Sequence, residues 1–182
     1  TSAHEDRKKK RRKRVIESVT PKLSVKLNVE ATPDLEAQII MDSHTSDDVI
    51  KARGNGNLQI EIDNNINVKI YGNYNITEGE YNFSLQGALR KRFEVGTESS
   101  ISFDGDPMTN CNMDINAKYQ TTASLSDLLE SSVTSYLNSN IVKVDCIANI
   151  TGPLLSPIVK FDIKLPTAEE EVQRLVKAAI NT

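Results

Sequence analysis

The sequence predicts an all-β fold, built on an extended antiparallel sheet with one apolar face and accompanied by one or two short amphipathic helices. Apolar and polar residues alternate through almost all of 66–119, and a period of two sends successive side chains to opposite faces of a sheet. Turn signals interrupt the alternation at short intervals, and no long helical crossover separates the expected strands. An antiparallel meander is the most economical topology for this arrangement.

The chain before residue 66 is expected to form four strands. The alternation begins at Lys22, and Pro33 breaks the ladder because proline cannot donate a backbone hydrogen bond. Gly54-Asn55-Gly56 indicates a tight turn or a bulge. Strands are expected at 23–29, 35–41, 49–53 and 58–62, with turns or loops at 31–34, 43–48 and 63–65.

The region 66–119 continues the same pattern with five further strands. Thr77-Glu78-Gly79 is expected to be a turn between two of them. Asp104-Gly105-Asp106-Pro107 is a stronger turn signal, because glycine tolerates positive φ and the aspartate side chains bond nearby backbone. Strands are expected at 66–76, 81–85, 92–95, 101–103 and 111–119, and a turn at 96–99.

The period changes after residue 124. Apolar residues recur at helical spacing over 125–138, with Ser124 or Ser126 as a cap, which predicts an amphipathic helix. Two strands are expected at 142–150 and 159–165. A final helix is expected over 167–181, because Thr167 and Glu170 have the spacing of a capping box. The chain therefore divides into a basic flexible segment, 1–21, and a β domain, 22–182.

Charge is segregated along the chain. The formal net charge is -3, yet residues 7–14 read R-K-K-K-R-R-K-R. The rest of the chain is acidic, so the protein has an acidic body and a basic head. Nucleic-acid binding, attraction to an anionic membrane surface and a solvated linker all fit such a run. No aromatic residue is interleaved with it, and no helix-turn-helix or zinc-finger pattern follows. A polar start at Thr1 suggests a piece of a longer protein.

No catalytic, metal-binding or cofactor-binding constellation is expected, and the protein is not predicted to be an enzyme. The only histidines are His4 in the head and His44 in a polar loop. No glycine-rich phosphate cradle occurs at a strand-to-helix junction. Cys111 and Cys146 fall on the apolar parity of their strands and are interpreted as buried thiols. A disulfide between them requires an oxidising compartment and neighbouring strands.

Several motifs in order resemble the C-terminal domain of the TamB family, the translocation and assembly module B proteins of double-membraned bacteria. They are G-N-Y-N-I-T-E-G-E-Y-N-F-S-L-Q-G, then F-E-V, I-S-F-D-G-D-P and D-I-N-A-K-Y, all between residues 72 and 119. The later V-D-C-I-A-N-I-T-G-P-L-L-S-P-I-V-K-F-D-I-K-L-P-T resembles a branch of the family with a cysteine at this point. The resemblance covers roughly residues 25–181, without the basic head.

The resemblance implies a sheet curled into a U-shaped, taco-like trough with an apolar interior. It also implies the periplasmic portion of an inner-membrane-anchored protein that works with a TamA-like outer-membrane barrel partner. The expected function is conduction of phospholipid between the inner and outer membranes. The alternative is an outer-membrane protein assembly module that binds nascent strands or the barrel partner by β-augmentation. A closed sandwich or barrel would show the same alternation, and a nucleic-acid binder driven by 7–14 is a third, weaker option.

The lipid-binding groove is expected to be lined by apolar residues of one parity. They are Val68, Ile70, Tyr74, Ile76, Tyr81, Phe83, Leu85, Phe103, Met113 and Ile115.

Overall fold

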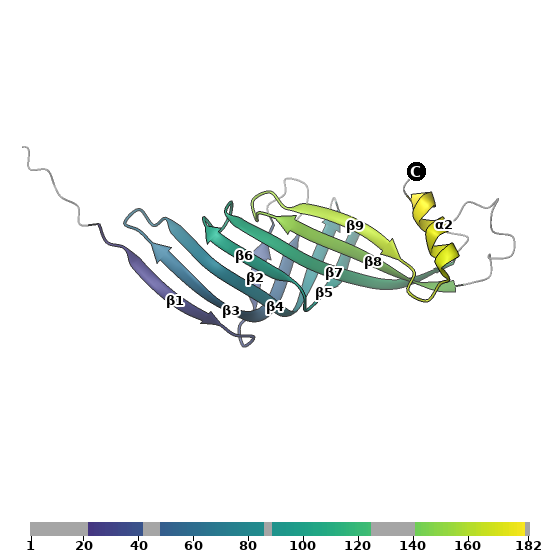
Figure 1. Ribbon diagram of the computed structural model, residues 1–182, viewed down its shortest axis with the longest axis horizontal. Helices are drawn as coiled ribbons and strands as arrows, with labels where there is room; N and C mark the ends of the chain where they lie inside the picture. The colour runs from purple at the N-terminus through teal and green to yellow at the C-terminus, as the bar shows by residue number, and fades with distance from the viewer. Residues whose placement is uncertain (1–21, 42–47, 86–88, 125–140, 181–182) are drawn as a thin grey trace, which may run out of the picture.

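The computed structural model describes residues 22–41, 48–85, 89–124 and 141–180, which form nine strands in one antiparallel sheet and one helix (Figure 1). The basic segment 1–21 and the helix expected at 125–138 lie outside these residues. The elements are β1 (Val25–Ala31), β2 (Ala37–Ile40), β3 (Val49–Ile62), β4 (Val68–Leu85), β5 (Leu89–Val95), β6 (Ser100–Gly105), β7 (Cys111–Ser124), β8 (Ile141–Gly152), β9 (Ile158–Lys164) and α2 (Glu170–Ile180).

The sheet is the expected antiparallel meander. Two strand positions in it are each occupied by a pair of short strands. β1 and β2 follow one another along β3, and β5 and β6 follow one another along β4. β7, β8 and β9 then add in sequence order. Within the described residues the ladder ends at β1 and β2 on one side and at β9 on the other, so the sheet is open rather than closed on itself.

The prediction of a turn at Thr77-Glu78-Gly79 is wrong, because these residues lie within β4, a single strand of 18 residues. The register against β3 shifts between Arg53 and Gly54, which leaves Thr77 as the extra residue of a β-bulge. The Thr77 hydroxyl donates to the Arg53 carbonyl at 3.0 Å. A bulge absorbs one residue without reversing the chain, so a polar Gly-containing triplet need not be a turn.

The bulge also explains the glycines opposite it. A Cβ atom on Gly54 would lie 2.1 Å from the carbonyl oxygen of Asn75, so no side chain fits there. The Gly54-Asn55-Gly56 segment is regularly paired strand within the 14-residue β3, so the tight turn or bulge expected there is wrong, and the bulge lies on the opposite strand at Thr77.

The β3–β4 turn is held by its first residue, as expected for an Asx turn. The Asp63 carboxylate accepts hydrogen bonds from the backbone N–H groups of Asn65 and Asn67, both at 2.9 Å, and from the Asn67 side chain at 3.0 Å. These hydrogen bonds, the Asn67 backbone bond first, lower the pKa of Asp63. Ile66 adopts φ 60°, a left-handed conformation that β-branched residues rarely take.

The junction of β5 and β6 is a turn over residues 96–99 whose last residue, Ser99, is buried against β7. The N–H of Asn116 donates to the Ser99 hydroxyl at 2.9 Å, and the Gly96 N–H donates to the Asn116 carbonyl at 2.8 Å. The expected turn is confirmed, and these bonds keep β5 and β6 on one path across the sheet.

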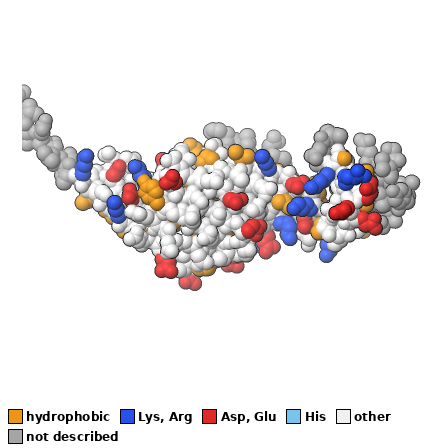
Figure 2. All heavy atoms as spheres, viewed as in Figure 1, with side chains coloured by type: hydrophobic (Ala, Val, Ile, Leu, Met, Phe, Trp, Pro, Cys, Tyr) orange, Lys and Arg blue, Asp and Glu red, His pale blue; other side chains and the backbone are white. Residues whose placement is uncertain are grey.

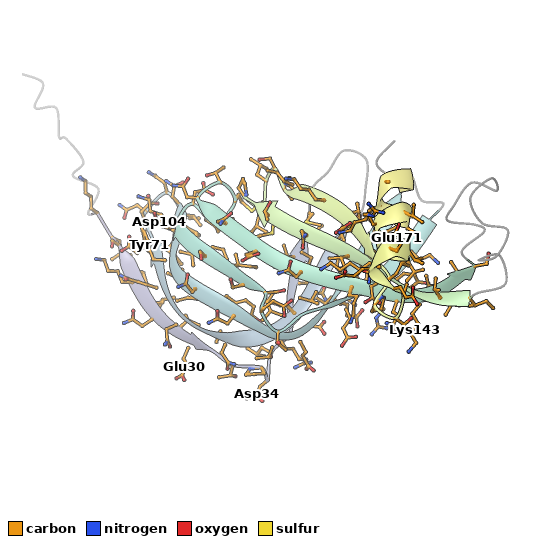
Figure 3. All side chains as sticks on the ribbon, turned by 45° about the vertical axis from the view of Figure 1, so that its right-hand side comes forward. Glu30, Asp34, Tyr71, Asp104, Lys143 and Glu171 are labelled. Carbon is orange, nitrogen blue, oxygen red and sulfur yellow. The ribbon has the colours of Figure 1, made fainter. Side chains whose placement is uncertain are left out.

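The sheet curls so that its apolar face is concave, which confirms the expected trough (Figure 3). Phe161 on the edge strand β9 meets two aromatic rings from the middle of the sheet. Its ring centroid lies 5.2 Å from that of Phe83 on β4 and 6.2 Å from that of Phe93 on β5. Strands far apart in the sheet order thus contact each other through their apolar side chains.

Helix α2 begins later than expected. The N–H of Ala168 bonds back to the carbonyl of Leu165 at 3.2 Å, forming a turn where the capping box was expected. The helix then starts at Glu170, and the N–H of Gln173 bonds to the Glu169 carbonyl at 3.1 Å. The expected Thr167 cap is therefore wrong.

Candidate functional site

The candidate site is the concave apolar face of the sheet, called the trough below. Cross-strand partners point to the same face, so the register shows which side chains line up across it. Directly opposed apolar residues form unbroken rows across three neighbouring strands. Examples are Val25–Ile62–Val68, Leu27–Ile60–Ile70, Tyr74–Ile101–Met113 and Ile115–Ile150–Val159.

The middle of the trough is filled by its own side chains. Tyr81, Met113, Ile115 and Ile150 have no measurable exposure, and Ile76 is almost as buried. They belong to one core cluster whose buried members lie on strands β3 to β8, together with Met41 directly after β2. The middle of the trough is therefore a packed core between two curved walls.

One wall is fixed by a buried polar contact. The Tyr81 hydroxyl donates to the Asp48 carboxylate at 2.5 Å, and the N–H of Ser84 donates to the other carboxylate oxygen at 3.0 Å. Burial raises the pKa of Tyr81, and the hydrogen bond and charge of Asp48 raise it further. Tyr81 thus stays a neutral donor in the range where tyrosine usually ionises.

A rim of aromatic rings lies where β9 meets the middle strands. Phe93 packs near Tyr81, Tyr119 and Phe161, with ring centroids 5.8, 5.9 and 6.2 Å away. The Lys91 ammonium lies 5.2 Å from the centre of the Tyr119 ring and forms no ion pair within the described residues. Lys91 opposes Phe83 in the register, so this rim combines apolar rings with a positive charge on the trough side.

The first strands of the sheet leave the trough open. Val25, Leu27 and Val29 of β1 are 40%, 45% and 37% exposed although they share a face with buried residues further along. Their partners on β3 and β4 are half-buried. We call this region the open end; it consists of Val25, Leu27, Val29, Leu58, Ile60, Ile62, Val68 and Ile70.

Helix α2 covers the opposite end of the trough. Val176 packs with Val144 and Leu165 in a second buried cluster, and Val172 and Leu175 pack against it. Val144 opposes Thr121 on β7, near the ends of both strands, and Figure 1 shows α2 lying across this end of the sheet. The trough is therefore closed by the helix at one end and uncovered at the other.

The residues expected to line a groove divide into four groups. Val68 and Ile70 lie half-buried in the open end, and Phe83 and Phe103 are partly buried against the core. The backbone of Leu85 pairs with Leu89, and its side chain is outside the described part. The remaining members are buried in the packed middle: Tyr74, Ile76, Tyr81, Met113 and Ile115.

The most accessible apolar side chains lie outside the expected set. On the trough side, Val25, Leu27 and Val29 of β1 precede the expected set in the chain and Phe161 follows it. The alternation of apolar and polar residues in the sequence already placed these side chains on the apolar face of the sheet. It could not indicate which part of that face stays uncovered, because this depends on how far the sheet curls.

The two cysteines are far apart. Cys146 opposes Tyr119 on β7, eight residues from Cys111 on the same strand. At ~3.3 Å per residue this is about 26 Å, far beyond the reach of a disulfide. Both are free thiols, and burial raises the pKa of Cys146.

A groove of about 940 Å³ lies on the opposite, polar face of the sheet. Charged side chains of both signs line it, and Arg92 pairs with Glu80 across two strands at 2.7 Å. Lys51, Glu80, Glu94 and Lys118 follow one another in the register. Its acids and bases largely neutralise one another, so it does not select a ligand of one charge.

Of three comparisons with known proteins, one found a match. No helix in the described ranges is long and apolar enough to cross a membrane. Comparison with curated proteins and with solved structures found no match. The family model of the TamB C-terminal domain matches residues 2–177, nearly the whole chain. The chain therefore belongs to the TamB family of bacterial envelope proteins.

Proposed function

We propose that the open end of the trough binds phospholipid acyl chains during lipid transfer between the inner and outer membranes. The TamB family is a transport and assembly module associated with the outer-membrane protein TamA. The observation that carries the proposal is the row of half-exposed apolar side chains on β1, which continues without a charge across β3 and β4. This is a surface for a long apolar ligand.

The energetic argument concerns a single acyl chain. Each methylene removed from water contributes ~0.8 kcal/mol, so a chain of about fifteen would gain on the order of 12 kcal/mol at most. A lipid leaves a bilayer only for a surface that is similarly dry and extended. The rows of the open end have this character, whereas the charged groove on the other face does not.

For an acyl chain to pass beyond the open end, the two curved walls of the trough must separate, because the middle of the trough is packed with side chains. The rim at Phe161 is the place where separation costs least. β9 is an edge strand, and Phe161 is half-exposed although it touches Phe83 and Phe93. Lys91 lies beside these rings and would attract a headgroup phosphate there. We infer that an acyl chain enters at the open end and that β9 moves to admit it further.

The test is lipid extraction from protein purified out of a double-membraned bacterium. Leu27→Asp places a charge in the middle of the open end, and Asn28→Asp places the same charge one residue away on the polar face. The wild type and Asn28→Asp should yield phospholipid by mass spectrometry, and Leu27→Asp should yield much less. Equal yields from both variants, or none from the wild type, would defeat the proposal.

The assembly function has its own supporting observation. β1 and β9 each present an unpaired strand edge in the described sheet, and such edges can accept a strand from another protein. Proline replacements distinguish this function from lipid binding, because proline removes an edge donor while leaving the apolar rows in place. If Asn28→Pro abolishes outer-membrane protein assembly but keeps bound lipid, strand addition at β1 is the function.

A further inference from the structure

One end of the sheet carries a series of exposed apolar side chains on otherwise polar turns. They are Leu23 before β1, Ile66 in the β3–β4 turn, Met108 in the β6–β7 turn and Leu155 in the β8–β9 turn. The register places these segments at the same end, because Val25 pairs with Ile62, Ile70 with Gly105 and Met113 with Gly152. We call this group of four residues the tip edge.

The segments of the tip edge contact one another. The Leu23 N–H donates to the side-chain oxygen of Asn64 in the β3–β4 turn. The Leu155 N–H donates to the Met108 carbonyl at 2.9 Å. Figure 3 shows Tyr71 and Asp104 together at this end of β4 and β6. The four apolar side chains are therefore presented by turns that lie along one margin of the molecule.

The turns hold these residues outward through defined hydrogen bonds. Asp106 accepts from the N–H of Met108 at 2.8 Å, in the same way that Asp63 organises the turn containing Ile66. Ile66 is 79% exposed in a left-handed conformation that favours glycine or asparagine. The exposed Ile66 side chain gains no stability from packing within the described structure, and its left-handed backbone conformation costs free energy.

The pattern fits a bilayer better than a protein partner. Protein interfaces bury contiguous apolar patches, whereas the tip edge consists of single apolar residues among polar turn residues. Figure 2 shows hydrophobic side chains reaching the surface in separate spots along this margin. Isolated apolar side chains on polar loops suit the boundary between headgroups and acyl chains, where the neighbouring backbone stays hydrated.

Charge supports an anionic surface. Residues 7–14 of the sequence are all basic, the described residues begin shortly after them at Lys22, which lies at this edge, and Lys69 lies just beyond the β3–β4 turn. The acids here are Asp63, Asp104 and Asp106, and the first and last are engaged by turn N–H groups. A basic segment beside inserting apolar residues is the combination that gives stable membrane attachment.

We propose that the tip edge docks this domain on an anionic bilayer, with Ile66, Met108 and Leu155 inserted. This goes beyond the trough, because docking is independent of whether the trough holds an acyl chain. It would also place the neighbouring open end close to the lipid.

The chain contains no tryptophan, so a single one reports insertion directly. Met108→Trp and Leu155→Trp should shift their emission to the blue and be quenched by brominated acyl chains when vesicles of phosphatidylcholine and phosphatidylglycerol are added. Ile141→Trp is the matched control, because Ile141 is 75% exposed at the opposite end of the sheet. A shift at Ile141→Trp as large as at the tips, or no shift at the tips, would overturn the proposal.

Sedimentation with the same vesicles separates the tips from the basic run. Ile66→Asn keeps a residue that suits the left-handed conformation, so folding is not at risk. Ile66→Asn and Leu155→Ser should each weaken binding on the order of fivefold, and Ile141→Asn should not. If both tip variants bind like the wild type while deletion of 7–14 abolishes binding, the basic run alone is responsible and the tip edge is not a membrane site.

Discussion

At the scale of single residues, the hydrogen bond between Tyr81 and Asp48 is the contact whose contribution to the unfolding free energy is most readily measured. Both side chains are buried, and Asp48 also accepts the Ser84 N–H. Tyr81→Phe keeps the ring but leaves a buried carboxylate oxygen without its donor, which should cost about 1–3 kcal/mol of unfolding free energy. Urea unfolding measures this, with Tyr71→Phe on the partly exposed face as the control.

The same residue predicts the behaviour at alkaline pH. The folded state raises the pKa of Tyr81 above its ordinary value of about 10. Above that value the unfolded chain releases the proton while the folded chain retains it, so stability is present below pH ~10 and falls as pH rises. Tyr74, whose pKa burial also raises, acts in the same direction. The decline in unfolding free energy above pH ~10 should be shallower in Tyr81→Phe, and an equal slope would exclude Tyr81 as its source.

At the scale of elements, the backbones of β3 and β4 approach each other closely beside the bulge in their pairing. Gly54→Ala puts a Cβ atom against the Asn75 carbonyl, which cannot move without breaking the ladder. We expect a loss of more than about 2 kcal/mol in unfolding free energy. Asn55→Ala, the exposed neighbour, should change stability by less than about 1 kcal/mol. Similar losses for the two variants would mean that close backbone approach is not the reason for Gly54.

The strands could be predicted because alternation is a local signal, and the turns at Asp63 and at Gly96–Ser99 were predicted for the same reason. The division at Thr77 was wrong because a bulge and a turn use the same residue types, and only pairing with Arg53 tells them apart. The helix start was misplaced because Ala168 bonds back to Leu165 in a turn that competes with the expected cap.

At the scale of the whole molecule, the residues of the apolar face could be predicted from the sequence. Which of them are buried and which stay exposed could not. Sequence parity placed Ile76, Met113 and Ile115 on the trough side. It could not show that curling would bury them while leaving Leu27 half-exposed, because contacts such as Phe83–Phe161 join strands at opposite sides of the sheet order. The trough thus combines a packed middle, a helix over one end and an open end near the tip edge.

The central claim is that the open end contacts acyl chains, and a photo-crosslinking residue at Leu27 tests it most directly. The neighbouring position, Asn28, supplies the control because it points to the polar face. Crosslinking in living cells followed by mass spectrometry should yield phospholipid adducts at position 27 and few at position 28. Adducts at position 27 that contain only protein, or phospholipid adducts of equal abundance at both positions, would contradict it.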